Sequence, residues 1–179
     1  VGPIDVLVNN AGAATSSPLA RTTLGDWHSL LEGNATGAFL CTRAALGRMV
    51  ERGSGRIVPV ASTAARAGLR CTPAHTASKH AAVGLMRAVA AEIAGTGVTA
   101  NAVCPTYVRT EMTERSIARI VAVTERSEDE AEAALIASSP LGRLLEPDEV
   151  AFAVVFLAAP QAGAINGQAL VLDGGGIQA

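Results

Sequence analysis

A histidine and a lysine four residues apart could take part in proton transfer to or from a bound molecule. His75 and Lys79 stand in the stretch AHTASKHAAVGL, and Lys79 is the only lysine of the 179-residue chain. Side chains at i and i+4 are neighbours on a helix surface. An imidazole with a pKa of ~6.5 suits proton transfer near neutral pH. A neighbouring ammonium disfavours the protonated imidazole, however, and that is the form able to donate a proton.

Other polar residues stand at positions where chemistry is plausible. Ser62 follows an expected strand, thirteen residues before His75, and Asn34 lies inside an expected helix. Each also has a simpler interpretation when taken alone: Lys79 as a solvated surface lysine, Ser62 as a turn residue at a strand end, and Asn34 as a polar interruption of a helix. Asp173, followed by three glycines, is expected to form a structural turn and subunit contact rather than a catalytic group.

The elements that must position these groups alternate between strand and helix patterns. Short apolar runs bounded by turn residues predict strands, and longer amphipathic stretches between them predict helices, with an interruption expected at EGNATG. Such alternation is typical of a parallel α/β sheet with helices on both faces. The expected strands are Ile4–Val8, Arg56–Ala61, Val98–Val103 and Ala169–Leu172, and the expected helical stretches are 23–52, 76–94, 111–139 and 147–159.

Composition excludes several classes of function. The net charge is −2 with scattered arginines, which argues against a nucleic-acid surface. The longest apolar run, AFAVVFLAAP, is far shorter than the ~20 residues that a bilayer span needs. Cys41, Cys71 and Cys104 lack metal or disulfide spacing, so no metal site is expected and a cytoplasmic location fits best.

Six motifs, taken in order, resemble the short-chain dehydrogenase/reductase family, most closely its 3-oxoacyl and polyketide ketoreductases. NNAG alone is a weak signal, but the ordered set with the 62–75–79 spacing is highly specific. The resemblance covers the whole chain and implies one domain, 1–179, with a Rossmann-like doubly wound parallel sheet. The motifs are NNAG (9–12), GNATGAF around Asn34, PVASTAA around Ser62, HTASK (75–79), NAVCPTYVRT (101–110) and LVLDGGG (170–176).

The resemblance implies an NAD(P)-dependent oxidoreductase that interconverts a ketone or 3-oxoacyl group and the secondary alcohol. A small ketone or acyl thioester would be the substrate, and the protein would form a homo-dimer or tetramer. In the family a tyrosine stands at position 75, and the lysine lowers its pKa from ~10. Ser62 would bind the carbonyl oxygen, Lys79 would hold the nicotinamide ribose, and Asn34 would position a relaying water.

Two further groups of residues take their roles from the resemblance. Tyr107 is expected to form a wall of the substrate mouth rather than to act as an acid. The family usually has Pro-Gly where this chain has Pro105-Thr106, and a threonine would be strained if that backbone needs positive φ. The implied cofactor contacts are Asn10, Ala11, Gly12, Lys79, Pro105, Val108 and Thr110, with NADP slightly favoured over NAD.

His75 is the sharp departure from the family pattern. Its ring is shorter than a phenol, and Lys79 opposes its protonation. Three interpretations stay open: a natural inactive relative, a deliberately crippled variant, or an enzyme adapted to histidine. Impaired catalysis is the expectation that we carry forward.

No strand and glycine-rich phosphate loop precede VGPIDVLVNNAG. The chain is therefore expected to be a C-terminal fragment holding strands 4 to 7 of the family fold, without the cofactor-binding strands before them. Truncation would lower activity further and leave the first strand as an exposed apolar edge. The alternative from another class is a non-catalytic binding or oligomerisation domain.

Overall fold

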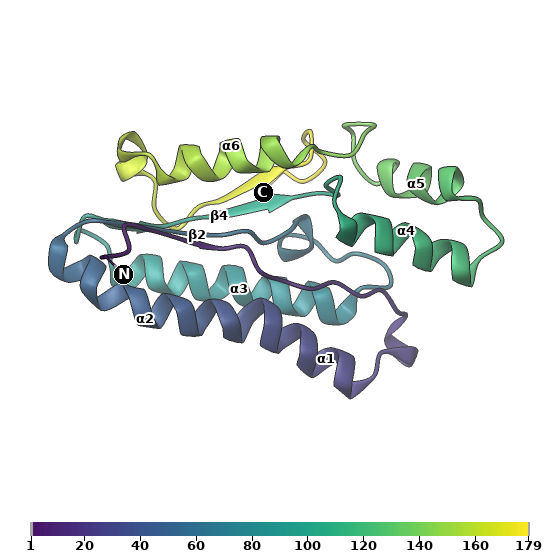
Figure 1. Cartoon of the computed structure of the whole chain (residues 1–179), viewed down its shortest axis with the longest axis horizontal. Helices are drawn as coiled ribbons and strands as arrows, with labels where there is room; N and C mark the ends of the chain where they lie inside the picture. Colours follow the sequence, from purple (N-terminus) through teal and green to yellow (C-terminus); the bar gives the residue numbers. More distant parts are fainter. Residues whose placement is uncertain (1, 179) are drawn as a thin grey trace.

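The computed structural model describes residues 2–178 and shows parallel strands between two layers of helices (Figure 1). Three strands pair in parallel in the order β1-β2-β3, and β4 pairs in parallel with β5. A parallel bridge between Val60 and Val103 joins the two ladders. The predicted α/β class with parallel strands is confirmed. The strands are β1 (Val6–Asn9), β2 (Gly55–Pro59), β3 (Val98–Ala100), β4 (Ala102–Pro105) and β5 (Ala169–Leu172).

Helices cover both faces of the strands. In Figure 1, α2 and α3 lie on one face, α6 lies on the other, and α4 and α5 project beyond one end. Within residues 2–178, no helix is both long and apolar enough to cross a membrane. The helices are α1 (Leu24–Leu31), α2 (Gly37–Arg52), α3 (Pro73–Glu92), α4 (Glu111–Val123), α5 (Glu128–Ile136) and α6 (Pro147–Ala158), with 3₁₀ turns η1 (Leu19–Arg21), η3 (Thr63–Ala65) and η4 (Pro160–Ala164) and a π turn, η2 (Glu32–Thr36).

Alternation along β2 divides the core between the two faces. Ile57 packs with Met49 of α2 and Met86 of α3, whereas its neighbour Val58 packs against Leu157 of α6. Successive strand side chains point to opposite faces, so both are buried although they are adjacent. The small aliphatic side chains that dominate the composition fill both halves of this core.

One expected strand differs from the structure. The stretch 98–103 divides at Asn101 into β3 and β4. The Asn101 side chain donates to the Ile165 carbonyl oxygen at 2.8 Å and accepts from the Gln168 amide at 2.9 Å. The chain therefore changes its pairing partner from β2 to β5 at this residue. The interruption expected at EGNATG is confirmed, because η2 separates α1 from α2 there.

The parallel arrangement brings the carboxyl ends of β1, β2 and β4 to one edge. Asn9 ends β1, Pro59 ends β2 shortly before Ser62, and Pro105 ends β4. Ligands of open α/β sheets bind outside this edge. Three of the predicted motifs therefore follow strands that end on the same side of the molecule.

Candidate active site

Asn34 is the centre of a hydrogen-bond network that joins three distant segments. It is buried within the π turn η2, a feature frequent at functional sites. Its side-chain oxygen accepts from the Ala13 amide at 2.9 Å, and its nitrogen donates to the Ala13 carbonyl oxygen at 2.9 Å. The same nitrogen donates to Ser78 Oγ at 2.9 Å, and Ser78 Oγ donates to the His75 carbonyl oxygen at 2.9 Å. Asn34 thereby ties the loop after β1 to the start of α3.

His75 also reaches this loop through its side chain. Its Nδ1 lies 3.2 Å from the Ala13 carbonyl oxygen, which accepts from Asn34 as well. A carbonyl oxygen has two lone pairs, so it can serve both partners. The predicted neighbours His75 and Lys79 both lie in α3, in the helix turns nearest to this loop.

The His75 imidazole is neutral near physiological pH. Burial and, to a smaller extent, the Lys79 cation lower its pKa, the hydrogen bond with Ala13 acts in the opposite direction, and the net result is a pKa of about 4. The sequence predicted the influence of Lys79. The structure adds that burial is the larger cause.

Lys79 is buried, and its ammonium group donates to the Val60 carbonyl oxygen at 3.1 Å. Burial lowers the pKa of Lys79 to about 8 because the ammonium is partly removed from water. A Cys104 thiolate would oppose this change, but burial raises the pKa of the Cys104 thiol, which therefore stays protonated near neutrality. Lys79 is thus mostly charged at pH 7, unlike His75.

The Gly12 backbone packs closely against the ends of the Asn34 and Lys79 side chains. A Cβ atom at Gly12 would lie 2.7 Å from Asn34 Oδ1 and 3.3 Å from Lys79 Nζ. Only a residue without a side chain fits between these two groups. An ammonium has three N–H donors, and within residues 2–178 one protein acceptor is bound to Lys79. The remaining donors suit hydroxyl groups of a ligand.

Ser62 has an unused donor. It precedes η3, and its Oγ accepts from the Ala64 amide at 3.1 Å. No acceptor for its hydroxyl hydrogen lies among the described residues, so this hydrogen is available for a ligand oxygen. Cys104 forms a hydrogen bond with the Ser62 backbone, which places the end of β4 beside this serine.

The segment after β4 carries the other expected site residues. Thr106 is not strained, because Cys71 is the one non-glycine residue with positive φ in the described chain. Burial raises the pKa of the Tyr107 phenol. Pro105 is buried and Val108 is half-buried, whereas Thr110 is exposed. No hydrogen bond within residues 2–178 joins these residues to Lys79, and Asn10 and Ala11 are exposed in the loop before Ala13.

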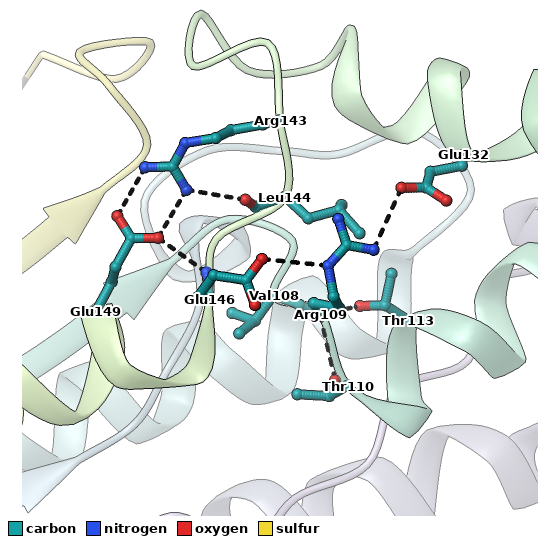
Figure 2. A network of polar contacts seen from close by, with 9 residues as sticks. All are labelled: Val108, Arg109, Thr110, Thr113, Glu132, Arg143, Leu144, Glu146 and Glu149. Carbon is teal, nitrogen blue, oxygen red and sulfur yellow. Dashed lines mark hydrogen bonds and ion pairs between the residues drawn. The ribbon is translucent and has the colours of Figure 1, made fainter.

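Ion pairs anchor the helical segment α4–α5 that follows this loop (Figure 2). Arg109 Nε lies 3.2 Å from Glu146 Oε1, and its Nη1 lies 3.6 Å from Glu132 Oε1 of α5. Arg143 binds both carboxylate oxygens of Glu149 at 2.7 and 2.8 Å. A backbone bridge between residues 108 and 145 brings the two ends of the segment together. The Arg109 contacts and the bridge therefore link the two ends of the segment at its base.

Two members of the site were absent from the sequence prediction. Ser78 belongs to the HTASK motif, but its link between Asn34 and His75 depends on a contact across 44 residues. Ala13 contributes through its backbone alone, so its side chain gave no signal. The Ser62, Lys79 and Asn34 positions were found, and their roles in catalysis stay predictions.

Comparison with known proteins agrees with the geometry. The family model described as enoyl-(acyl carrier protein) reductase matches residues 1–176. A Streptomyces coelicolor protein named as a ketoacyl reductase is 42% identical over 176 residues, covering 97% of this chain and 67% of the relative. The chain belongs to the short-chain dehydrogenase/reductase family.

Further relatives of this family widen the range of named activities. A D-threitol dehydrogenase of Mycolicibacterium smegmatis is 42% identical, with 97% of this chain and 63% of the relative covered. Among solved structures, an actinorhodin polyketide ketoreductase crystallised with NADPH matches with a TM-score of 0.92 and 42% identity, over 97% of this chain and 67% of that one. This short-chain dehydrogenase/reductase chain therefore spans about two thirds of the length of its relatives.

Replacement of Ser78 tests whether the network holds this family site together. Ser78→Ala leaves one Asn34 N–H without its buried partner, so we expect the free energy of unfolding to fall by ~1–3 kcal/mol. Ser116→Ala in α4 is the matched control, because Ser116 also bonds a carbonyl of its own helix, at 2.9 Å from Met112. Chemical denaturation of both variants measures the difference. If Ser78→Ala and Ser116→Ala have the same free energy of unfolding, the Asn34–Ser78 bond contributes nothing to stability.

Proposed function

We propose that this chain is the catalytic and substrate-binding part, as one domain, of an NAD(P)-dependent reductase. The reaction is the interconversion of a ketone or 3-oxoacyl group and the corresponding secondary alcohol, at a rate lowered by His75. The observation that carries this proposal is the buried Lys79 ammonium, which has unused donors and lies beside the Gly12 backbone.

The residues present fit the ribose end of a nicotinamide dinucleotide. Lys79 would donate to ribose hydroxyl groups, and the neighbouring backbone around Gly12 would lie beside them. Asn10, Ala11, Pro105, Val108 and Thr110 are proposed contacts on the strength of the family pattern. When bound, the nicotinamide supplies or accepts hydride at the substrate carbon.

The protein's own groups would act on the substrate oxygen. The free hydroxyl hydrogen of Ser62 donates to it and stabilises negative charge during reduction. Tyr107 forms an apolar wall beside it. His75 occupies the position from which the family's tyrosine gives a proton, yet its ring is neutral and carries few protons to give at pH 7. Binding is therefore retained in this account, whereas proton donation is weakened.

The relatives support the substrate class. Several are named as ketoacyl or 3-oxoacyl-acyl-carrier-protein reductases, and others as acetoacetyl-CoA reductases. An acyl thioester is therefore our first choice of substrate and a smaller ketone the second. The NADPH named for the actinorhodin ketoreductase favours NADP over NAD.

One observation favours a second candidate, a non-catalytic binding or oligomerisation domain. The neutral His75 imidazole stands where the family has its proton-donating tyrosine. A protein that performs no reduction would lose no activity by this replacement. Restoring the phenol separates the two candidates, because only a site that is otherwise complete would respond to it.

In the full-length protein, we expect His75→Tyr to raise ketone reduction by at least ~10²-fold, the usual value of general acid catalysis. The new phenol would have its pKa lowered by the Lys79 cation, so Lys79→Ala in the same background should remove the gain. The assay is steady-state oxidation of NADPH and NADH with an acetoacetyl thioester and with decalone.

His80→Tyr is the matched control for that experiment. His80 lies in the same helix but is exposed, with Nδ1 2.9 Å from the Thr76 carbonyl oxygen, so its replacement should leave the rate unchanged. If the histidine form already turns over at rates typical of reductases and tyrosine adds nothing, His75 is a working acid. If neither form is active, the non-catalytic candidate stands.

We also propose self-association as a dimer or tetramer and a cytoplasmic location, the latter supported by three free cysteines. Small residues form an exposed stripe on α3, at Ala81, Gly84, Ala88 and Ala91, where a second helix could approach closely. Ala82, expected in the same stripe, instead faces the core. Light scattering should give at least a dimeric mass, and a clean monomer at high concentration would refute the assembly.

A further inference from the structure

The hydrogen bond of His75 determines which of its nitrogens carries the proton. The Ala13 carbonyl oxygen can only accept, so the Nδ1 atom 3.2 Å away must be the donor. A neutral imidazole has one N–H group, and here Nδ1 holds it. Nε2 makes no hydrogen bond within residues 2–178 and keeps its lone pair.

Asn34 holds the carbonyl in place for this bond. It binds both the amide and the carbonyl of Ala13, each at 2.9 Å, which prevents the peptide from turning its N–H toward the ring. Through Ser78 it also fixes the backbone carbonyl of His75 itself. The two sides of the Nδ1 bond are therefore anchored to one side chain.

The doubly protonated ring, in which Nε2 would also be a donor, is opposed by its surroundings. His75 is half-buried, and the Lys79 ammonium is its neighbour on α3. A second cation beside the first would lose hydration and gain repulsion. Both effects act against protonation of Nε2 and leave it as an acceptor.

We propose that Asn34, through Ala13, fixes His75 as the Nδ1–H tautomer, and that the free Nε2 recognises the hydroxyl of a secondary alcohol rather than a carbonyl. An alcohol O–H can donate to Nε2, whereas a ketone oxygen would face it as a second acceptor. Asn34 is a positioning residue in this arrangement. The choice of an alcohol as ligand rests on the proposed function, whereas the tautomer does not.

The tautomer is measured by long-range ¹H–¹⁵N NMR of the histidine rings at pH 7. The chain has three histidines, and His28→Gln and His80→Gln assign the other two. We expect a protonated Nδ1 and an unprotonated Nε2 at His75. Protonation at Nε2, alone or with Nδ1, would overturn the proposal.

Asn34→Ala tests the positioning role. Release of Ala13 should give a mixture of tautomers at His75, while Thr42→Val, which removes the neighbouring 3.1 Å bond from Asn9, should leave the ring unchanged. An unchanged ring in Asn34→Ala would remove Asn34 from the proposal. The NMR spectrum of the wild-type protein shows whether Nε2 of His75 is an acceptor, even if Asn34→Ala does not fold.

Hydroxyl recognition is tested with cyclohexanol and cyclohexanone at equal concentrations. The alcohol should shift the Nε2 resonance more than the ketone does, and His75→Gln should abolish the signal. Equal shifts, or none with either probe, would overturn the recognition step. Failure of the reductase assays would leave the nitrogen assignments untouched, so the two proposals fail separately.

Discussion

The candidate site depends on the two hydrogen bonds between the Asn34 amide and the backbone of Ala13. The loop after β1 has no long polar side chain of its own beyond Asn10, and the π turn places Asn34 where it satisfies both groups of one peptide. The bond to Ser78 carries the same constraint into α3. The close approach of the Gly12 backbone to Lys79 depends on these segments being held at fixed separations.

The protonation states of Lys79 and His75 follow from the position of two basic side chains next to each other in a partly buried site. Lys79 and His75 would both be cations if charged, so only one of them keeps its proton near neutrality. With a phenol at position 75 the same lysine would also lower the pKa, but there it would stabilise the phenolate anion and so make the phenol a better proton donor. A tyrosine at position 75 would thus be a proton donor helped by the lysine. The histidine found there is instead a hydrogen-bond acceptor, because the lysine opposes its protonation.

The sequence predicted the features that depend on the spacing of residues close together in the chain. The i, i+4 relation placed His75 beside Lys79, and the strand and helix patterns gave the parallel α/β class. It did not predict contacts between distant segments. Asn101 looked like one residue of a continuous strand because its partners lie more than sixty residues later. The partner of Asn34 is the backbone of Ala13, which any residue could supply, so no residue type revealed it.

The protonation state of the His75 ring is measured directly by an NMR titration of its carbon-bound protons. Because the folded pKa is depressed, the ring should stay neutral through pH 6.5 and gain its proton only around pH 4. A midpoint for His75 near the ordinary value of ~6.5 would contradict the account, because a substantial share of the rings could then donate a proton at neutral pH.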